Sequence, residues 1–266
     1  MFMLIGILYF FIILLVISTS AIAGISGGVV LRPIFDLLGY HDVREIAFYM
    51  AISVITMAIS STIKQLKLGT KIKIDKALTL ALGAIIGGVL GQETLQWMDN
   101  YLNSNVIQMF QNIMSILLLL VVLFATRQTI RTYELKGVAW YVLAGFGLGG
   151  VASVLSIGGG PINVIAFTII FGITLKEATV YSITTILFTQ LARLITMARA
   201  PEGLTIFDME LLWFIIPAAI IGGYIGGKLN VKFSDAQVIK VFKFVVIGTI
   251  LINVWNAIKF GLGLIV

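Results

Sequence analysis

The sequence predicts an all-α integral membrane protein built from two inverted repeats. Three observations predict this fold class: the composition, two long uncharged stretches and an internal repeat. Hydrophobic residues make up 59% of the 266 residues and charged residues only 11%, against roughly 25% charged residues in soluble domains. A soluble core of this size cannot bury so much apolar surface, so lipid must be the solvent.

The uncharged stretches are long enough to cross a membrane. The first 31 residues carry no charge, and neither does the stretch 137–175. As a single helix the second stretch would be about 58 Å long, roughly twice a bilayer core. It must therefore cross twice, or cross once and fold back. Apolar helices are predicted at 2–23, 44–63, 77–97, 106–126, 138–156, 178–198, 209–229 and 238–258.

The two halves of the chain, 1–136 and 137–266, repeat one another within one integrated membrane domain. The first copy of a glycine-rich motif is matched 132 positions later: Gly24-Ile25-Ser26-Gly27-Gly28 aligns with Ser156-Ile157-Gly158-Gly159-Gly160. Further matches follow at the same shift, with Glu45 and Tyr49 meeting Glu177 and Tyr181. Ordered glycines together with a Glu and a Tyr at one shift make chance agreement improbable.

Charge distribution favours an inverted pair. Residues 64–76 carry five Lys, whereas their counterpart in the second half carries Arg193, Arg199 and three acids. Residues 92–105 carry no Lys or Arg, and their counterpart carries four Lys. Inversion places most cations on one side, as the positive-inside rule requires, with both termini outside and 64–76 inside.

A Gly/Pro-broken segment lies in each half, at 25–39 and 157–172. Inversion needs an odd number of crossings per half, so each broken segment would contribute one, giving ten in all. A purely re-entrant segment would give eight crossings and a parallel pair. Unwound backbone at membrane depth is tolerated only inside protein or around a watery cavity, where free N–H groups and helix N-termini can bind an anion. The alternative is that these glycines only allow close helix packing.

We prefer the packing explanation for a second set of glycines at four-residue spacing. They are Gly83, Gly87, Gly91, Gly222, Gly223, Gly226 and Gly227.

Polar residues in and near the broken segments are the candidate substrate ligands. Arg32 lies just before Pro33 in an apolar segment. It could bind an anion, pair with Asp36 one turn on, or snorkel to an interface. Arg193 is a second cation of this kind. The full set of candidate substrate-binding residues is Ser26, Gly27, Gly28, Arg32, Ser156, Gly158, Gly159, Gly160, Pro161, Asn163, Gln190 and Arg193.

Three acids are candidates for proton coupling: Asp36, Glu45 and Glu177. For Glu45 and Glu177 an alternative is that each opens a helix and is stabilised by the helix dipole.

Other function classes are disfavoured. The absence of Cys excludes Zn-thiolate sites and thiol chemistry, and no cofactor or metal is expected. The pattern Gly145-Phe146-Gly147-Leu148-Gly149-Gly150 fits a dinucleotide motif but lies in an uncharged membrane segment without a following acid. An intramembrane serine protease built on Ser26 would need a general base, and the one histidine, His41, lies in a nearby loop. We therefore predict neither an enzyme nor a nucleic-acid-binding protein.

The doubled motif resembles the TauE/SafE family of anion transporters, also called the toluene sulfonate uptake permease family. The resemblance rests on both glycine motifs, on Pro33, Pro161 and Asn163, and on Lys176-Glu177-Ala178 and the two Ala-Ile-Ile-Gly-Gly stretches. It covers nearly the whole chain. Ser26 stands where a third glycine is common in the family.

The resemblance implies a secondary transporter, and an exporter, in the bacterial inner membrane. Its substrates would be small anions such as sulfite, sulfoacetate or another organosulfonate, moved by alternating access and coupled to protons. The absence of Cys argues against a thiosulfate carrier. An anion channel or a non-transporting membrane scaffold remains the alternative. Lipid is the expected partner, and a homo-oligomer stays open.

Overall fold

The computed structural model describes residues 2–70, 73–126, 132–199 and 203–262, which contain ten helices. The first five are α1 (Phe2–Ala23), α2 (Gly27–Leu38), α3 (Val43–Lys67), α4 (Ile74–Tyr101) and α5 (Ser104–Ala125). The second five are α6 (Val138–Val154), α7 (Gly160–Phe171), α8 (Leu175–Ala198), α9 (Leu212–Lys232) and α10 (Asp235–Leu262). The all-helical prediction is confirmed, and each half contributes four longer helices and one short helix.

The short helices α2 and α7 are the two segments that Gly and Pro break. Each has 12 residues, or about 18 Å of helix, too little to span a bilayer core alone. The chain turns sharply before each helix, and the residues at the turn, Gly24 (φ 67°) and Ser156 (φ 53°), both have left-handed backbone. Both helices also end at a left-handed glycine, Gly39 and Gly172. The chain therefore turns before and after the short helix in the same way in both copies, although Gly158 and Gly159 of the second motif have left-handed backbone and the equivalent Ser26 and Gly27 do not.

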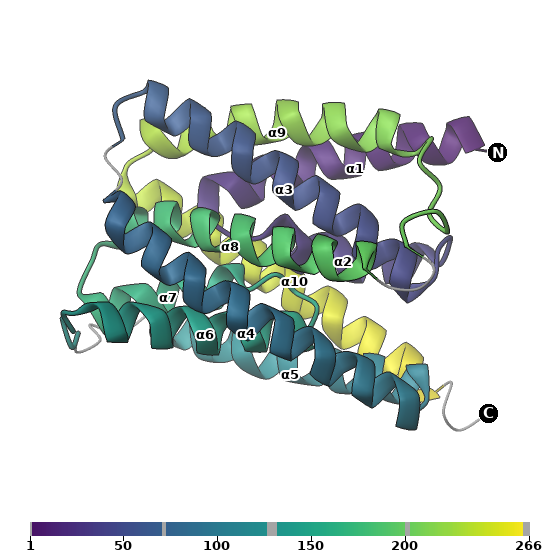
Figure 1. Ribbon diagram of the computed structural model, residues 1–266. Coiled ribbons are helices and arrows are strands. Elements are labelled where there is room, and N and C mark those ends of the chain that lie inside the picture. The colour runs from purple at the N-terminus through teal and green to yellow at the C-terminus, as the bar shows by residue number, and fades with distance from the viewer. Residues whose placement is uncertain (1, 71–72, 127–131, 200–202, 263–266) are drawn as a thin grey trace.

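Equivalent connections of the two halves lie at opposite ends of the bundle (Figure 1). The α3–α4 connection is at the left of that view and the α8–α9 connection at the right. The start of α1, the end of α2 and the end of α10 also lie at the right-hand end. This arrangement is consistent with two inverted repeats and with the prediction that 64–76 and the termini face opposite sides.

Close packing along two helix pairs explains the regularly spaced glycines. A Cβ at Gly87 on α4 would overlap the carbonyl oxygen of Phe146 on α6, and one at Gly83 would overlap that of Val142. In the other half, a Cβ at Gly226 on α9 would meet Ala21 and the carbonyl oxygen of Ser18 on α1. The preference for packing at these glycines is confirmed, since only small residues allow backbones to approach so closely.

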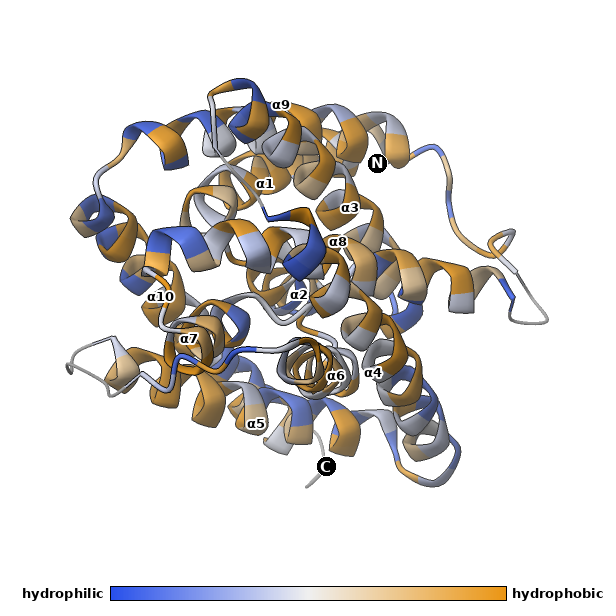
Figure 2. Ribbon diagram, turned by 60° about the vertical axis from the view of Figure 1, so that its left-hand side comes forward, coloured by the Kyte–Doolittle hydropathy of each residue, from blue (hydrophilic) through white to orange (hydrophobic). Residues whose placement is uncertain are grey.

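The outer surface is apolar. Seven helices of the described residues are long and apolar enough to cross a membrane, and α6 and α7 are shorter apolar helices. Exposed Leu82, Val121 and Phe244 lie on outer faces, and Figure 2 shows hydrophobic residues along the helices with hydrophilic ones concentrated toward the connections. The protein is thus a multi-pass membrane protein whose outer helices face lipid.

Polar residues cap two helices that begin three residues before the predicted start: α8 at Leu175 and α10 at Asp235, where the Gln237 N–H donates to Ser234 Oγ at 3.4 Å. A third capped helix, α3, begins at Val43, one residue before the predicted start. Asp42 and Glu45 form a capping box at the start of α3, in which the Glu45 N–H donates to Asp42 Oδ1 at 2.8 Å and the Asp42 N–H donates to Glu45 Oε2 at 3.1 Å. Thr174 caps α8 by accepting from the Glu177 N–H at 3.1 Å.

Candidate functional site

The two broken motifs meet in the interior of the bundle. A Cβ at Gly160 would overlap the backbone nitrogen of Ser26, and one at Gly158 would overlap the Ser26 hydroxyl. The hydroxyl of Ser182 on α8 donates to the carbonyl oxygens of Gly24 (2.8 Å) and Gly160 (3.4 Å), so one side chain ties both turns together. Residues more than 130 positions apart thus form one backbone layer at the interface of the repeats.

The backbone of the second motif is unwound, as the glycines predict. Gly158 (φ 71°) and Gly159 (φ 81°) have left-handed conformations that side chains with a Cβ rarely adopt. Their N–H groups have no recorded backbone partner in the described part of the chain. In the first motif, the Ser26 hydroxyl accepts from the Gly28 N–H at 3.2 Å and caps α2. The second copy therefore has the freer N–H groups.

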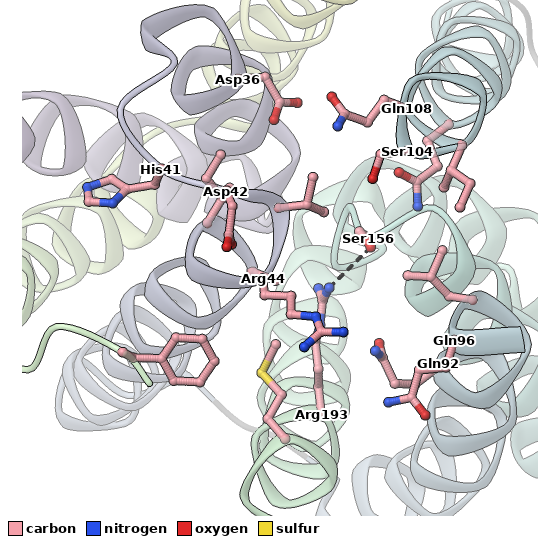
Figure 3. Close-up of a pocket in the computed structure, with 18 of the residues that line it drawn as sticks. Asp36, His41, Asp42, Arg44, Gln92, Gln96, Ser104, Gln108, Ser156 and Arg193 are labelled. Atoms are coloured by element: carbon pink, nitrogen blue, oxygen red, sulfur yellow. Dashed lines mark hydrogen bonds between the residues drawn. The ribbon is translucent and has the colours of Figure 1, made fainter. Parts of the chain in front are cut away.

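A cavity of about 1030 Å³ leads from one end of the bundle to this layer. Its mouth includes the connections at Gly39 and Gly203, at the end where α2 finishes and α9 begins. Its floor includes Gln111, Ser156 and Arg193. Figure 3 shows the side chains of Arg44 from α3 and Arg193 from α8 pointing into the same space.

Arg193 is the buried cation of the cavity floor. Arg193 lines the cavity, yet only 5% of the residue's surface is exposed. Its Nη2 donates to the hydroxyl of Ser156 at 3.1 Å (Figure 3), and its Nε has no hydrogen-bond partner. A guanidinium carries five N–H donors that match the oxygens of an oxyanion, so Arg193 has donor capacity to spare for a ligand.

Arg32 lies behind the floor. Its Nη2 donates to Gln111 Oε1 at 2.6 Å, and its Nε is 3.6 Å from Asp36 Oδ2. Gln111 is held in turn by donating from Nε2 to the carbonyl oxygen of Val154 at 2.8 Å. Asp36 and Gln111 line the cavity, whereas Arg32 does not. The structure favours the pairing of Arg32 with Asp36 among the alternatives left open by the sequence.

Most other predicted ligands lie beneath the floor, outside the cavity lining. They are buried and surround the unwound second motif: Ser26, Gly27, Gly28, Gly158, Gly159, Gly160, Pro161, Asn163 and Gln190. Asn163 Oδ1 and Gln190 Oε1 have no hydrogen-bond partner there. Buried polar atoms are normally satisfied, so these two oxygens leave the layer with unused acceptors among the described residues.

The three candidate acids separate. Asp36 faces the cavity. Glu45 and Glu177 each lie in the first turn of a helix, at the caps of α3 and α8, and neither lines the cavity. Their positions agree with the alternative in which they stabilise helix starts through the helix dipole.

Sequence reasoning missed the amide wall of the cavity. Gln92 and Gln96 face the arginines from α4, and Gln108 lies beside Ser104 at the start of α5 (Figure 3). Gln92 and Gln96 are four residues apart, and Gln108 and Gln111 are three residues apart. Both spacings place the two side chains of a pair on the same face of a helix. Polar residues at helical spacing near the ends of apolar helices were the available signal. Arg44, at the mouth, was not among the predicted ligands either.

These features define a multi-pass membrane protein with a polar, cation-bearing cavity that ends at an internal repeat interface. The family model described as "Sulfite exporter TauE/SafE" matches residues 9–253. The chain therefore belongs to the TauE/SafE family, a family of membrane transporters, and this membership agrees with the resemblance seen in the sequence. No curated protein and no solved structure matches the chain.

Proposed function

We propose that the protein is a secondary transporter that exports a small organosulfur or sulfite-like anion across the bacterial inner membrane by alternating access, with proton coupling. The family supports an anionic substrate, and the cavity supplies a site for one. Nothing in the proposal needs a cofactor or a metal.

One observation carries the proposal: Arg193 is a buried guanidinium on the floor of an open cavity, and no acid of the described residues lies within ion-pair distance of it. An uncompensated charge in a low-dielectric interior is costly, and buried charges are normally paired. A bound oxyanion would pair with Arg193 and accept its unused donors. Ser156 and the amides of Gln92 and Gln111 could hold the remaining oxygens.

The layer beneath the cavity floor offers a second position for the anion along its path. The N–H groups of Gly158 and Gly159, which have no backbone partner among the described residues, lie where the two repeats meet, with the side-chain amides of Gln190 and Asn163 beside them. In inverted-repeat transporters a site at the repeat interface is exposed to each side in turn when one repeat moves against the other. We propose that the anion passes from Arg193 to this layer and leaves on the opposite side.

Calorimetric titration of the purified protein with sulfite tests the site. Charge-assisted hydrogen bonds contribute about 1.5–3 kcal/mol, so Arg193→Met should weaken binding at least about tenfold. The affinity of Arg193→Lys for sulfite should lie between those of the unmodified protein and Arg193→Met, because Lys keeps the charge but lacks the planar guanidinium. The matched control is Arg199→Met, which removes an exposed cation from the mouth of the same cavity and should change affinity about twofold or less. Equal losses at Arg193 and Arg199 would refute the floor site.

A further inference from the structure

All buried charges of the described residues gather at the cavity floor. The charged side chains classed as buried there are Arg32 (6% exposed), Asp36 (8%) and Arg193 (5%). Asp36 and Arg193 line the cavity, and Arg32 reaches it through Gln111. They therefore form one electrostatic cluster.

Two cations and one carboxylate leave this cluster with one uncompensated positive charge. In a low-dielectric interior a surplus charge is far more costly than in water, so the charge of the bound ligand matters as much as its shape. A monovalent anion completes the balance. A divalent anion overshoots it by one negative charge, and Asp36 is the buried acid that can remove the excess by accepting a proton.

We propose that Asp36 matches the site to the charge of its ligand: a monovalent sulfonate binds without a proton, whereas a divalent oxyanion binds together with one proton on the Asp36 carboxylate. The proton comes from the aqueous cavity and is released when the anion leaves. This inference rests on the proposed anion site and adds the coupling residue and the number of protons carried.

Asp36 is placed for this role by its surroundings. Arg32 holds it from its own helix at 3.6 Å, and its carboxyl faces the cavity opposite Gln108 (Figure 3). The Nζ of Lys259 on α10 lies 3.5 Å from the Asp36 backbone oxygen. The carboxylate thus contacts both the fixed cation and the aqueous space from which a proton can arrive.

Other titratable or charged groups face the same region. They are His41, Asp42, Arg44 and Tyr49 from the α2–α3 connection and α3, Arg193 and Arg199 from α8, Lys259 from α10, and Tyr9 from α1. Of these, Asp42, Arg44, Arg199 and Lys259 are exposed at the mouth, where water and salt screen their charges. A histidine, His41, also lines the cavity, so it needs its own control.

Calorimetry with two probe anions tests the inference without titration of the ligand itself. Methanesulfonate is monovalent and sulfate divalent throughout the range from about pH 6 to pH 8. Titrations in buffers of different ionisation enthalpy give the number of protons taken up. We expect uptake of about one proton per sulfate bound, so the affinity for sulfate should fall about tenfold for each unit by which the pH rises. For methanesulfonate we expect no uptake and affinity constant within about twofold.

Three variants identify the group. Asp36→Asn should bind sulfate without proton uptake and without pH dependence, because the neutral amide replaces the protonated acid. Asp42→Asn, which keeps an N-cap for α3, and His41→Gln should both retain one proton per sulfate.

The contrary outcomes are distinct. Sulfate binding without proton uptake in the unmodified protein would overturn the inference, even if Asp36→Asn failed to fold. So would uptake that survives in Asp36→Asn or disappears in His41→Gln. If neither anion bound, the proposed anion site itself would be refuted.

Discussion

The two buried arginines differ in what surrounds them. Arg32 has a carboxylate 3.6 Å away and a short hydrogen bond to Gln111. Arg193 has only the hydroxyl of Ser156 and an unpartnered Nε. A cation whose charge is already compensated within the protein attracts a ligand only weakly. We therefore expect Arg193 to bind the anion and Arg32 to hold Asp36 in position.

A double substitution tests that division. Arg32→Ala leaves Asp36 buried and unpaired, which should cost about 3–5 kcal/mol of stability and thereby also lose anion binding. Adding Asp36→Ala removes the orphaned acid, so the double variant should regain stability and bind methanesulfonate through Arg193. Thermal unfolding and calorimetry of both variants measure this. A stable double variant that does not bind would make Arg32 a ligand, as its sequence position alone first suggested.

At the level of elements, the first residue of the short helix α7 packs against the turn that precedes the short helix α2. Gly28 and Gly160 are equivalent in the repeat, yet their surroundings differ. A Cβ at Gly160 would overlap backbone atoms of Ile25 and Ser26, whereas one at Gly28 has only the Ser26 hydroxyl (3.3 Å) and more distant neighbours. The second copy of the motif therefore has less room.

The equivalent pair provides a matched test of this packing. Gly160→Ala must push the two turns apart, and overpacking of this kind typically costs about 1–3 kcal/mol. Gly28→Ala should cost much less, because a hydroxyl can rotate aside. Thermal unfolding in detergent and anion transport should both be impaired more by Gly160→Ala. Equal stability of the two variants would show that the motifs do not pack as described.

The same elements show how far sequence reasoning reaches. Uncharged length predicts the long helices, and Gly24 and Gly158 predict the breaks, because few other residues adopt left-handed backbone. The start of α8 was missed by three residues because capping by Thr174 extends the helix beyond its apolar stretch. The repeat predicts that both motifs matter, and the structure brings them together.

The sequence alone could not show how deeply each polar side chain is buried or which neighbours it contacts in the folded protein. Arg32 looks like the isolated membrane cation because of its apolar neighbours, but tertiary contacts give it Asp36 and Gln111. Arg193 was predicted only as a second cation of the same kind, yet it lies on the cavity floor. Gln92 and Gln96 read as ordinary polar residues near a loop until α4 is placed against α8.

For the whole molecule, the cavity opens at the end that carries the start of α1 and the end of α10 (Figure 1). The Lys-rich α3–α4 connection lies at the other end, which the positive-inside rule makes cytoplasmic. With the predicted orientation, the described conformation would be open to the outside, and the proposed anion site would be reached from there.

Reporter fusions determine this orientation. A reporter that is active only in the cytoplasm should be active when inserted at residue 70. A reporter that is active only outside the membrane should be active when fused after residue 266. We therefore expect opposite locations for the two fusion sites. The same location for both would be incompatible with the inverted repeat and would reassign the side to which the cavity opens.

Counterflow is the most direct test of the central claim that this protein is an anion carrier with alternating access. Proteoliposomes loaded with unlabelled sulfite should take up labelled sulfite faster than empty ones, because the return of a loaded site is faster than that of an empty one. Arg193→Met should abolish this stimulation and Arg199→Met should retain it. Uptake that is equally fast in loaded and empty vesicles would indicate a channel, no uptake would indicate a scaffold, and either result would contradict the account.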